Sequence, residues 1–245
     1  MSVPLALAAG RDRWEPRLHR VAENLGWPQA WLREFQTYLR DPRMTQEEFW
    51  VRYTLKRMEA APAFRAITSE PDALAFYMER DYLLWRQVVY RRRSAWHRVV
   101  ATMRSRRGTL LEVGCGIAPV SAWCAARRPE WQYALWDLLD APHTQYGLWR
   151  VLRRAKSAMI VWPDQAEVIT ALEVFEHLAD PLKMAVRCVA TLAPGGSFHW
   201  NFVETEGREL DLATAAQRRE TMAYLAEALE TVWREPGFTA ARKRR

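Results

Sequence analysis

The chain has 245 residues, of which 49% are hydrophobic and 27% charged, and its net charge is +7. This length allows a sizeable buried core, and no apolar run approaches the roughly 18 residues that a membrane span needs. Cys115, Cys124 and Cys188 have no paired spacing, which predicts free thiols and a reducing, cytoplasmic setting.

The positive charge belongs to the N-terminal part of the chain. Residues 1–107 hold 20 Lys and Arg against 12 Asp and Glu, a balance of +8, whereas residues 108–245 hold 16 against 17, a balance of −1. Nearly all of the N-terminal basic residues are arginines, whose planar guanidinium suits bidentate contacts with phosphate or carboxylate groups. We therefore expect this part to face an anionic acceptor or carrier.

The N-terminal part is predicted to form successive helices separated by prolines. Apolar residues recur at three- and four-residue spacing in three stretches, 14–25, 28–39 and 45–59. Thr45 and Glu48 have the spacing of a capping box at the start of the third stretch. A longer helical stretch is expected over residues 69–103, with a break near Arg92.

Residues 76–97 interleave aromatic side chains with arginines. On one face of a helix, such a pattern would suit base stacking and phosphate binding by a nucleic acid. It also fits an amphipathic helix whose aromatic rings face the core while arginine stems lie along its edge. We favour the second interpretation, a helical lid over a ligand pocket, and do not favour a nucleic-acid partner.

From Gly108 onward, the pattern changes to strands that alternate with helices. Strands are expected at residues 109–113, 131–137, 157–162, 167–172, 197–203 and 238–243. This alternation predicts an α/β fold with a parallel sheet covered by helices on both faces. The chain is thereby divided into a helical cap and substrate-binding region, residues 1–107, and a sheet domain, residues 108–245.

The first strand of the sheet domain ends in Glu112 and enters a glycine turn. Gly114 and Gly116 allow a sharp turn and the close approach of a ligand, and a helix is expected over residues 120–127. A dinucleotide-binding loop would have a third glycine where this chain has Pro119, and the Gly-Lys-Ser/Thr of a phosphate loop is absent. The loop therefore suits a ligand that carries a cation and neutral polar edges, and not a pyrophosphate.

A second acidic residue, Asp137, closes the next strand. It lies 21 residues beyond Gly116 (137 − 116), where a β-α-β unit normally holds a ribose diol. Glu173 follows the fourth expected strand in the same way. Because ligands of such sheets bind outside the carboxyl ends of the strands, Glu112, Asp137 and Glu173 should meet at one site.

Four motifs in this order resemble those of the class I S-adenosylmethionine-dependent methyltransferases, particularly the ubiquinone-biosynthesis O-methyltransferase branch. They are the glycine loop, Asp137, the segment 167–181 and Pro194-Gly195-Gly196 before the fifth strand. The resemblance covers residues 108–240. It implies a Rossmann-like three-layer sheet with an N-terminal helical cap, and S-adenosyl-L-methionine as the cofactor.

The resemblance also implies a set of cofactor-binding residues. The glycine loop and the acid before it would hold the methionine part, the acid after the second strand the ribose, and the acid after the third strand the adenine. These positions are Glu112, Gly114, Cys115, Gly116, Asp137, Leu138, Asp164 and Glu173.

Two features depart from the family pattern. Ala118 replaces a third loop glycine, which is tolerable if that residue keeps a negative φ. Only seven residues follow Phe238, so either the sheet lacks its usual seventh strand or the register of the last strand is displaced.

Glu173, Glu176 and His177 have i, i+3 and i+4 spacing, which on a helix would place all three on one face. Two carboxylates and an imidazole suit magnesium, manganese or zinc. The string also resembles the metal-binding motif of small-RNA 2′-O-methyltransferases, with His199 as the counterpart of their further histidine. Because Glu-His followed by Asp-Pro is widespread in superfamily members that bind no metal, we assign no metal ligand.

We expect methyl transfer to a hydroxyl of a small, anionic molecule, with His177 as the candidate base. The alternatives are metal-assisted methylation of an RNA ribose 2′-hydroxyl, C- or N-methylation of a natural product, and a non-catalytic partner subunit of the same fold. The sequence leaves the acceptor and the oligomeric state open.

Overall fold

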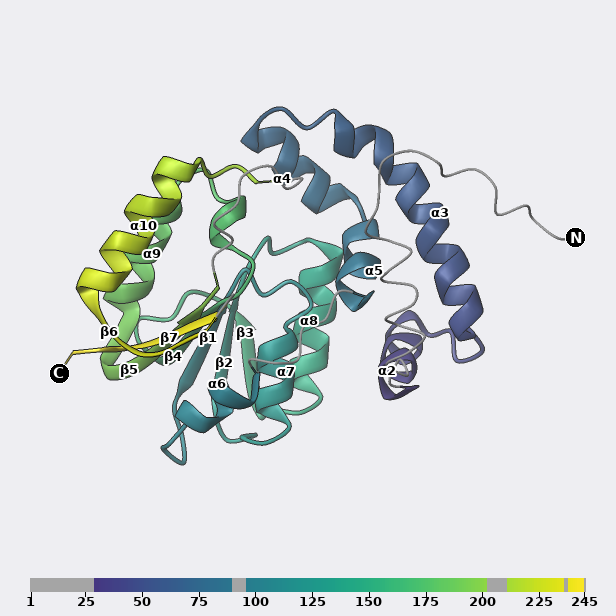
Figure 1. Cartoon of the computed structure of the whole chain (residues 1–245). Helices are drawn as coiled ribbons and strands as arrows, with labels where there is room; N and C mark the ends of the chain where they lie inside the picture. Colours follow the sequence, from purple (N-terminus) through teal and green to yellow (C-terminus); the bar gives the residue numbers. More distant parts are fainter. Residues whose placement is uncertain (1–28, 90–95, 202–210, 236–237, 245) are drawn as a thin grey trace, which may run out of the picture. The chain divides into compact units, whose positions relative to one another are not determined.

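The computed structural model describes residues 29–89, 96–201, 211–235 and 238–244 (Figure 1). The chain divides into two compact units, residues 1–52 and 53–245. The helix expected at 14–25, and the expected break near Arg92, lie outside the described residues. No described helix is long and apolar enough to cross a membrane.

The first unit contains α2 (Gln29–Leu39) and the beginning of α3 (Gln46–Arg65). The Phe35 ring packs edge-on against Phe49, with centroids 5.8 Å apart. The predicted capping box is confirmed, because the Glu48 amide donates to Thr45 Oγ1 at 3.1 Å and the Thr45 amide donates to Glu48 Oε2 at 2.8 Å.

The helical stretch expected over residues 69–103 is interrupted earlier than predicted. It contains α4 (Glu70–Glu79), α5 (Tyr82–Val89) and α6 (Trp96–Thr102). The side chain of Ser69 accepts the Asp72 amide at the start of α4, and the extended backbone of Arg80 ends that helix. An apolar pattern that continues past Arg80 conceals this break, because the spacing of side chains does not report backbone angles.

The second unit is built on a seven-stranded sheet with the order β3-β2-β1-β4-β5-β7-β6. The strands are β1 (Thr109–Val113), β2 (Gln132–Trp136), β3 (Ser157–Ile160), β4 (Ala166–Ala171), β5 (Leu192–Trp200), β6 (Leu229–Glu235) and β7 (Phe238–Lys243). The first five are parallel, and β7 runs antiparallel to both of its neighbours. The predicted three-layer α/β fold is confirmed, but the sheet is mixed and not wholly parallel as expected, because β7 is antiparallel to its neighbours.

Helices cover both faces of this sheet (Figure 1). They are α7 (Pro119–Ala125), α8 (Pro142–Leu152), α9 (Pro181–Thr191) and α10 (Ala215–Ala228), of which α7 and α8 lie with α6 on one face and α9 and α10 on the other. Double coverage explains why four of the five residues of β1 are buried and why these four, residues 110–113, are apolar except for Glu112.

The end of the sheet differs from the sequence prediction. Residues 238–243 are the seventh strand and not the sixth, and the sixth is β6, so the predicted register was displaced. Five of the seven β6 residues are exposed, because β6 is an edge strand, and it therefore carries no apolar run. The Pro236-Gly237 dipeptide between the two strands was the available signal for a turn.

Candidate active site

The glycine loop between β1 and α7 requires its glycines. Gly114 and Gly116 have φ of 59° and 49°, and a Cβ on Gly114 would lie 2.5 Å from a methyl group of Val174, while one on Gly116 would collide with Gln87. Ala118 also adopts a positive φ, 47°. The expectation of a negative φ at that position is wrong, because the chain must turn there to enter α7.

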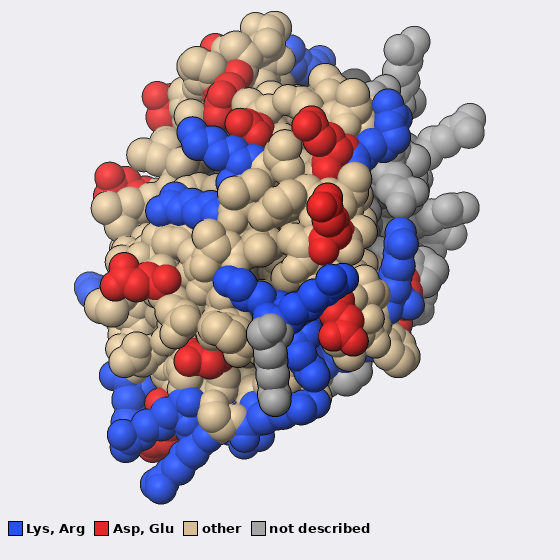
Figure 2. All heavy atoms as spheres, turned by 90° about the vertical axis from the view of Figure 1, so that its left-hand side faces the viewer, with Lys and Arg blue, Asp and Glu red and all other residues tan. Residues whose placement is uncertain are grey.

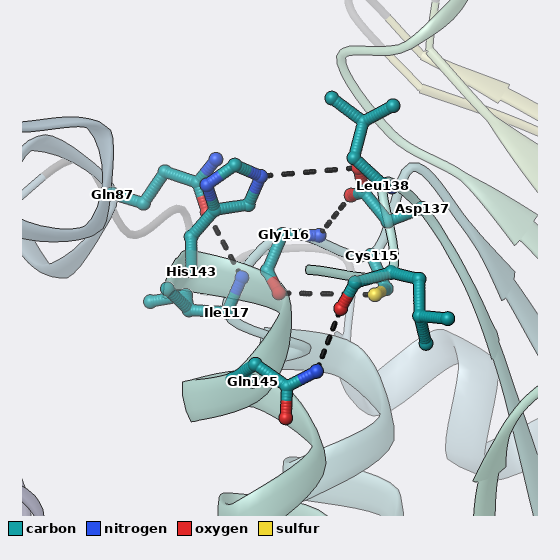
Figure 3. A network of polar contacts seen from close by, with 9 residues as sticks. Gln87, Cys115, Gly116, Ile117, Asp137, Leu138, His143 and Gln145 are labelled. Atoms are coloured by element: carbon teal, nitrogen blue, oxygen red, sulfur yellow. Dashed lines mark hydrogen bonds and ion pairs between the residues drawn. The ribbon is translucent and has the colours of Figure 1, made fainter. Parts of the chain in front are cut away.

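Side chains from two other segments accept the amides of this loop (Figure 3). Asp137 Oδ2 accepts the Gly116 amide at 2.7 Å, and Gln87 Oε1 accepts the Ile117 amide at 2.9 Å. Asp137 therefore lies against the loop, as its place after β2 predicts, and its Oδ1 also accepts the Leu138 amide at 2.7 Å. Sequence reasoning missed Gln87, since it lies on α5 with no spacing that connects it to the loop.

Glu112 anchors the helix that follows the loop. Its side chain is buried, and its two oxygens accept the amides of Val120 at 3.1 Å and Ser121 at 2.7 Å in the first turn of α7. Burial raises the pKa of Glu112 to about 7, although the hydrogen bonds from Ser121 and Val120 oppose this change. These contacts give Glu112 a structural role, and its predicted contact with the cofactor stays a prediction.

His143 and Tyr77 extend the site beyond the loop. His143, on α8, is buried with its Nε2 3.8 Å from Asp137 Oδ1. The Tyr77 ring of α4 meets the His143 ring nearly edge-on, at 6.1 Å between centroids. Neither residue was predicted, although Tyr77 belongs to the aromatic stretch interpreted as a lid.

The predicted metal motif is not helical where the three ligands would need it. Glu173 has φ of 58°, and a single 3₁₀ turn, Phe175–His177, follows it. The Glu173 amide donates to Asn201 Oδ1 at 2.5 Å, and the Asn201 side-chain nitrogen donates to the Glu173 carboxylate. The expectation of three ligands on one helical face is therefore wrong, since the backbone turns immediately after β4.

His177 pairs with a carboxylate from a distant part of the chain. Its Nδ1 lies 3.7 Å from Asp211 Oδ1, and Arg218 Nη2 lies 2.8 Å from Asp211 Oδ2. Arg218 is buried and also donates through Nε to the Ala213 carbonyl at 3.0 Å. The three side chains thus form an Arg218–Asp211–His177 chain in which the imidazole is the most exposed member.

Glu176 is the most perturbed acid beside this chain. Its side chain is 1% exposed, and its Oε2 has no hydrogen-bond partner among the described residues. Burial, then the charges of Glu173 and Asp211, raise the pKa of Glu176 to about 7. At neutral pH this carboxyl group is therefore partly protonated.

Tyr77 connects the two halves of the site. Burial first, and then the charges of Asp137, Glu176 and Asp211, raise the pKa of its hydroxyl well above the ordinary value, while Arg86 opposes the change. Charges from the glycine-loop side and from the Glu176 side thus act on one hydroxyl. The carboxyl ends of β2, β1 and β4 lie side by side in the parallel sheet, and Gly114 lies against Val174, so the side chains at these ends belong to a single site.

His199 does not join the candidate metal ligands. It is fully buried on β5, with Nε2 3.1 Å from Thr102 Oγ1 and 3.2 Å from Ser197 Oγ, and burial lowers its pKa to about 3. In the described part of the chain, no three His, Cys, Asp or Glu side chains are placed to hold a metal ion. Glu173, Glu176, His177 and His199 therefore do not form the metal site considered from the sequence.

Asp164 lies exposed in the short link between β3 and β4, and its contact with adenine stays a prediction. Beside it, the Trp162 ring packs edge-on against Trp136 at 5.5 Å, and its indole nitrogen donates to Thr191 Oγ1 at 2.8 Å. The two rings form an apolar wall at the ends of β2 and β3 that sequence reasoning did not anticipate.

Comparison with known proteins decides the family. A family model described as "Methyltransferase domain" matches residues 84–240, more than half of the chain. The protein belongs to the class I S-adenosylmethionine-dependent methyltransferases. No curated protein sequence matches this methyltransferase.

Solved structures share the fold of this methyltransferase. An O-methyltransferase family protein from Burkholderia thailandensis aligns with a TM-score of 0.52 and 11% identity, over 80% of this chain and 71% of that one. The magnesium protoporphyrin IX methyltransferase of Synechocystis PCC 6803, determined with the cofactor bound, aligns with a TM-score of 0.54 and 11% identity, over 73% and 98%. The ubiquinone-biosynthesis branch stays a prediction.

S-adenosylmethionine is the cofactor of this enzyme family, and the residues of the loop fit it. Two glycines with positive φ leave open backbone where a Cβ would collide, and Asp137 closes β2 beside them. We therefore propose Gly114, Gly116 and Asp137 as residues that would hold the cofactor, with Cys115 and Leu138 adjacent in the chain.

Proposed function

We propose that this methyltransferase methylates a hydroxyl group of a small molecule, with His177 as the base that accepts the hydroxyl proton. The observation that carries the proposal is the Arg218–Asp211–His177 chain, in which a buried ion pair at 2.8 Å fixes the carboxylate beside the imidazole. O-methyltransferases are among the proteins that share the fold, which supports the same acceptor atom.

The cofactor supplies an electrophilic methyl group when it is bound. The protein's own contribution is to orient the acceptor and to move one proton. The acceptor oxygen would take the methyl group as its bond to the cofactor sulfur breaks and the neutral thioether leaves, and the hydroxyl proton would pass to His177 Nε2. Asp211 then faces the protonated ring at Nδ1 and stabilises its positive charge, before the proton returns to water.

The helices before β1 are proposed to form the acceptor-binding cap. Tyr77 on α4 and Gln87 on α5 approach the site from this segment. Their position supports a substrate-binding role for the residues before 108 and a cofactor-binding role for the sheet domain. The anionic character of the acceptor remains part of this proposal. Arg86 supports an anionic acceptor, because its positive charge is close enough to lower the pKa of the Tyr77 hydroxyl.

A cytoplasmic location is proposed from the cysteines. Cys115, Cys124 and Cys188 are all unpaired and buried. Burial raises the pKa of Cys188 to about 12, so its thiol stays protonated and inert at neutral pH.

The base is tested by His177→Ala and Asp211→Asn. Each is expected to lower kcat at least tenfold while S-adenosylhomocysteine affinity changes less than threefold, and Asp211→Asn should shift the acidic limb of the kcat–pH profile, because the imidazolium loses its carboxylate. Glu220→Gln, an exposed acid on α10, is the control. Full activity with an unchanged pH profile in His177→Ala would contradict the base assignment.

The acceptor class is tested by transfer of labelled methyl from the cofactor to a lysate separated into RNA, protein, lipid and small molecules. Label is expected in the small-molecule fraction. Treatment with EDTA is expected to leave the rate unchanged, since the site residues are assigned no metal. Label that enters RNA and is lost on chelation would replace this proposal with metal-assisted ribose methylation.

A further inference from the structure

The amino ends of the three neighbouring strands β3, β2 and β1 carry an unusual density of basic side chains. Because these strands are parallel and adjacent, the segments that precede them reach the same edge of the sheet. Eight basic residues lie there, and we call them the basic edge: Arg104, Arg106, Arg107, Arg127, Arg128, Arg153, Arg154 and Lys156. All are exposed except Arg154, which is half-buried.

Few acids balance this charge. Glu130 pairs with Lys156 at 2.7 Å, and Glu167 accepts the Thr109 amide at 2.6 Å. The pKa of Glu130 is lowered, first by the Lys156 hydrogen bond and further by the charges of Lys156, Arg107 and Arg106. Cations from the connections that precede β1 and β3 therefore act on a carboxylate in the connection that precedes β2, as the adjacency of these parallel strands implies.

A short motif occurs twice within the basic edge. Trp-x-x-x-Arg-Arg begins at Trp123 and again at Trp149, and each copy spans the last turn of a helix, α7 or α8. The Arg127 guanidinium lies 3.5 Å from the Trp123 ring centroid, and the Arg153 guanidinium lies 4.7 Å from the Trp149 centroid. Stacking holds each planar guanidinium in place, so that less side-chain freedom is lost on binding.

Helix polarity explains only part of this arrangement. A cation at the C-terminus of a helix stabilises that helix by about 0.3–1 kcal/mol. This effect accounts for one arginine at the end of each helix. It does not account for a second arginine in both copies, nor for the cluster before β1. Like charges this close repel one another, and binding of a polyanion would relieve that repulsion.

We propose that the basic edge binds the phosphate backbone of a nucleic acid. Seven of its eight cations are arginines, which can contact phosphate in a bidentate manner, and cations at successive strand ends repeat roughly every 4.8 Å. The edge lies at the opposite end of the strands from Asp137 and Glu176. It is thus a docking surface, separate from the acceptor site.

An anionic membrane fits this edge less well than a nucleic acid does. The tryptophans of the two motifs lie beneath their arginines, so they are not presented for insertion into a bilayer. Helices α7 and α8 end at the edge and do not lie along it (Figure 1). Figure 2 views the molecule from the side of α9 and α10. Lys and Arg side chains gather at the lower end of this face, at the height of the connection between α6 and β1 in Figure 1.

The proposal is tested by fluorescence anisotropy of the full chain with a labelled 20-nucleotide poly(U) RNA and with a 20-base-pair DNA in 50 mM KCl. Micromolar binding to at least one of them is expected, with an affinity that falls steeply as salt rises. The quadruple variant Arg127→Gln, Arg128→Gln, Arg153→Gln, Arg154→Gln should weaken binding at least tenfold.

The matched control removes four charges elsewhere, through Arg43→Gln, Arg65→Gln, Lys183→Gln and Arg219→Gln. It should weaken binding less than threefold. A double variant, Arg127→Lys and Arg153→Lys, keeps the charge but loses the stacked guanidinium, and a threefold to fivefold loss is expected. Cofactor affinity and the unfolding temperature of each variant report whether the fold is intact.

Two results would overturn the proposal. One is the absence of binding to both nucleic acids in 50 mM KCl; co-sedimentation with phosphatidylserine vesicles would then assign the edge to a membrane surface. The other is equal weakening by the control and the test quadruple, which would show that net charge alone is responsible.

Discussion

At the scale of single residues, Asp137 combines two tasks, because its carboxylate holds the glycine loop and closes the strand where a ribose is expected. Asp137→Ala should weaken S-adenosylhomocysteine binding at least tenfold by calorimetry, since each charge-assisted hydrogen bond is worth about 1.5–3 kcal/mol. Asp137→Glu keeps the charge and should recover part of the loss. Wild-type affinity in Asp137→Ala would show that the cofactor does not use this side chain.

Glu112 is expected to behave differently from Asp137, because its oxygens bond to the amides of Val120 and Ser121. Glu112→Ala should lower the free energy of unfolding by about 1–3 kcal/mol, as removal of a buried acceptor leaves two amides unpaired. Denaturant unfolding measures this change. If Glu112→Ala keeps its stability but loses cofactor affinity, Glu112 binds the cofactor directly and does not mainly stabilise the fold.

Glu176 predicts the direction in which stability changes with pH. Its pKa rises from 4.5 to about 7 on folding, so between these values the folded state holds the proton more tightly than the unfolded chain. The stabilisation of the folded state by this proton is complete below about pH 4.5 and is lost as pH rises through 7. Glu176→Gln should therefore reduce the loss of stability between pH 5 and pH 8 by roughly 2 kcal/mol.

The measurement for Glu176 is urea unfolding at pH 5 and pH 8, with Glu220→Gln as the exposed control. Glu112, whose pKa is also raised to about 7, changes stability in the same direction. Some pH dependence should therefore remain in Glu176→Gln. An identical pH dependence in the wild type and Glu176→Gln would show that folding does not raise the pKa of Glu176.

At the scale of elements, α8 packs directly onto the glycine loop through Gly147. A Cβ at this position would lie 2.6 Å from the Gly116 carbonyl oxygen and 3.0 Å from the Ala118 nitrogen. Inside a helix, Gly→Ala normally stabilises by about 1 kcal/mol. Here the added methyl group would displace the loop, so the opposite sign is expected.

Gly147→Ala should accordingly lower the unfolding temperature and weaken S-adenosylhomocysteine binding at least fivefold. Calorimetry and a thermal melt measure the two effects. Lys183→Ala, at an exposed site on α9, should change neither. A stabilised Gly147→Ala variant with full cofactor affinity would mean that the loop can shift without cost.

At the scale of the whole molecule, residues 53–245 are a compact unit and the family model begins at residue 84. A chain that begins at Gln46 retains all of α3 and should bind S-adenosylhomocysteine within twofold of the full chain. The acceptor KM is the quantity that would reveal a role for the first unit. Loss of cofactor binding in this truncation would show that the first unit supports the sheet.

Much of the sheet domain followed from local pattern. The apolar run 109–113 ends in a carboxylate and a glycine turn, which specifies a strand, a loop and a helix through short-range sterics alone. Asp137 was assigned for the same reason, since parallel strands bring their carboxyl ends together. The edge strand β6 was missed because partial burial leaves no apolar signature, and a displaced register of the last strand followed from that omission.

The sequence by itself determined the family, the approximate positions of the first five strands along the chain and the acids that close them, because these depend on contacts within a few residues or on the fixed geometry of a β-α-β unit. Only the tertiary structure decided which side chains meet. It placed Gln87 on the glycine loop, Asp211 beside His177 and His199 away from Glu176. Such pairings join residues 30 or more positions apart, or depend on a single positive φ at Glu173, and no local pattern records them.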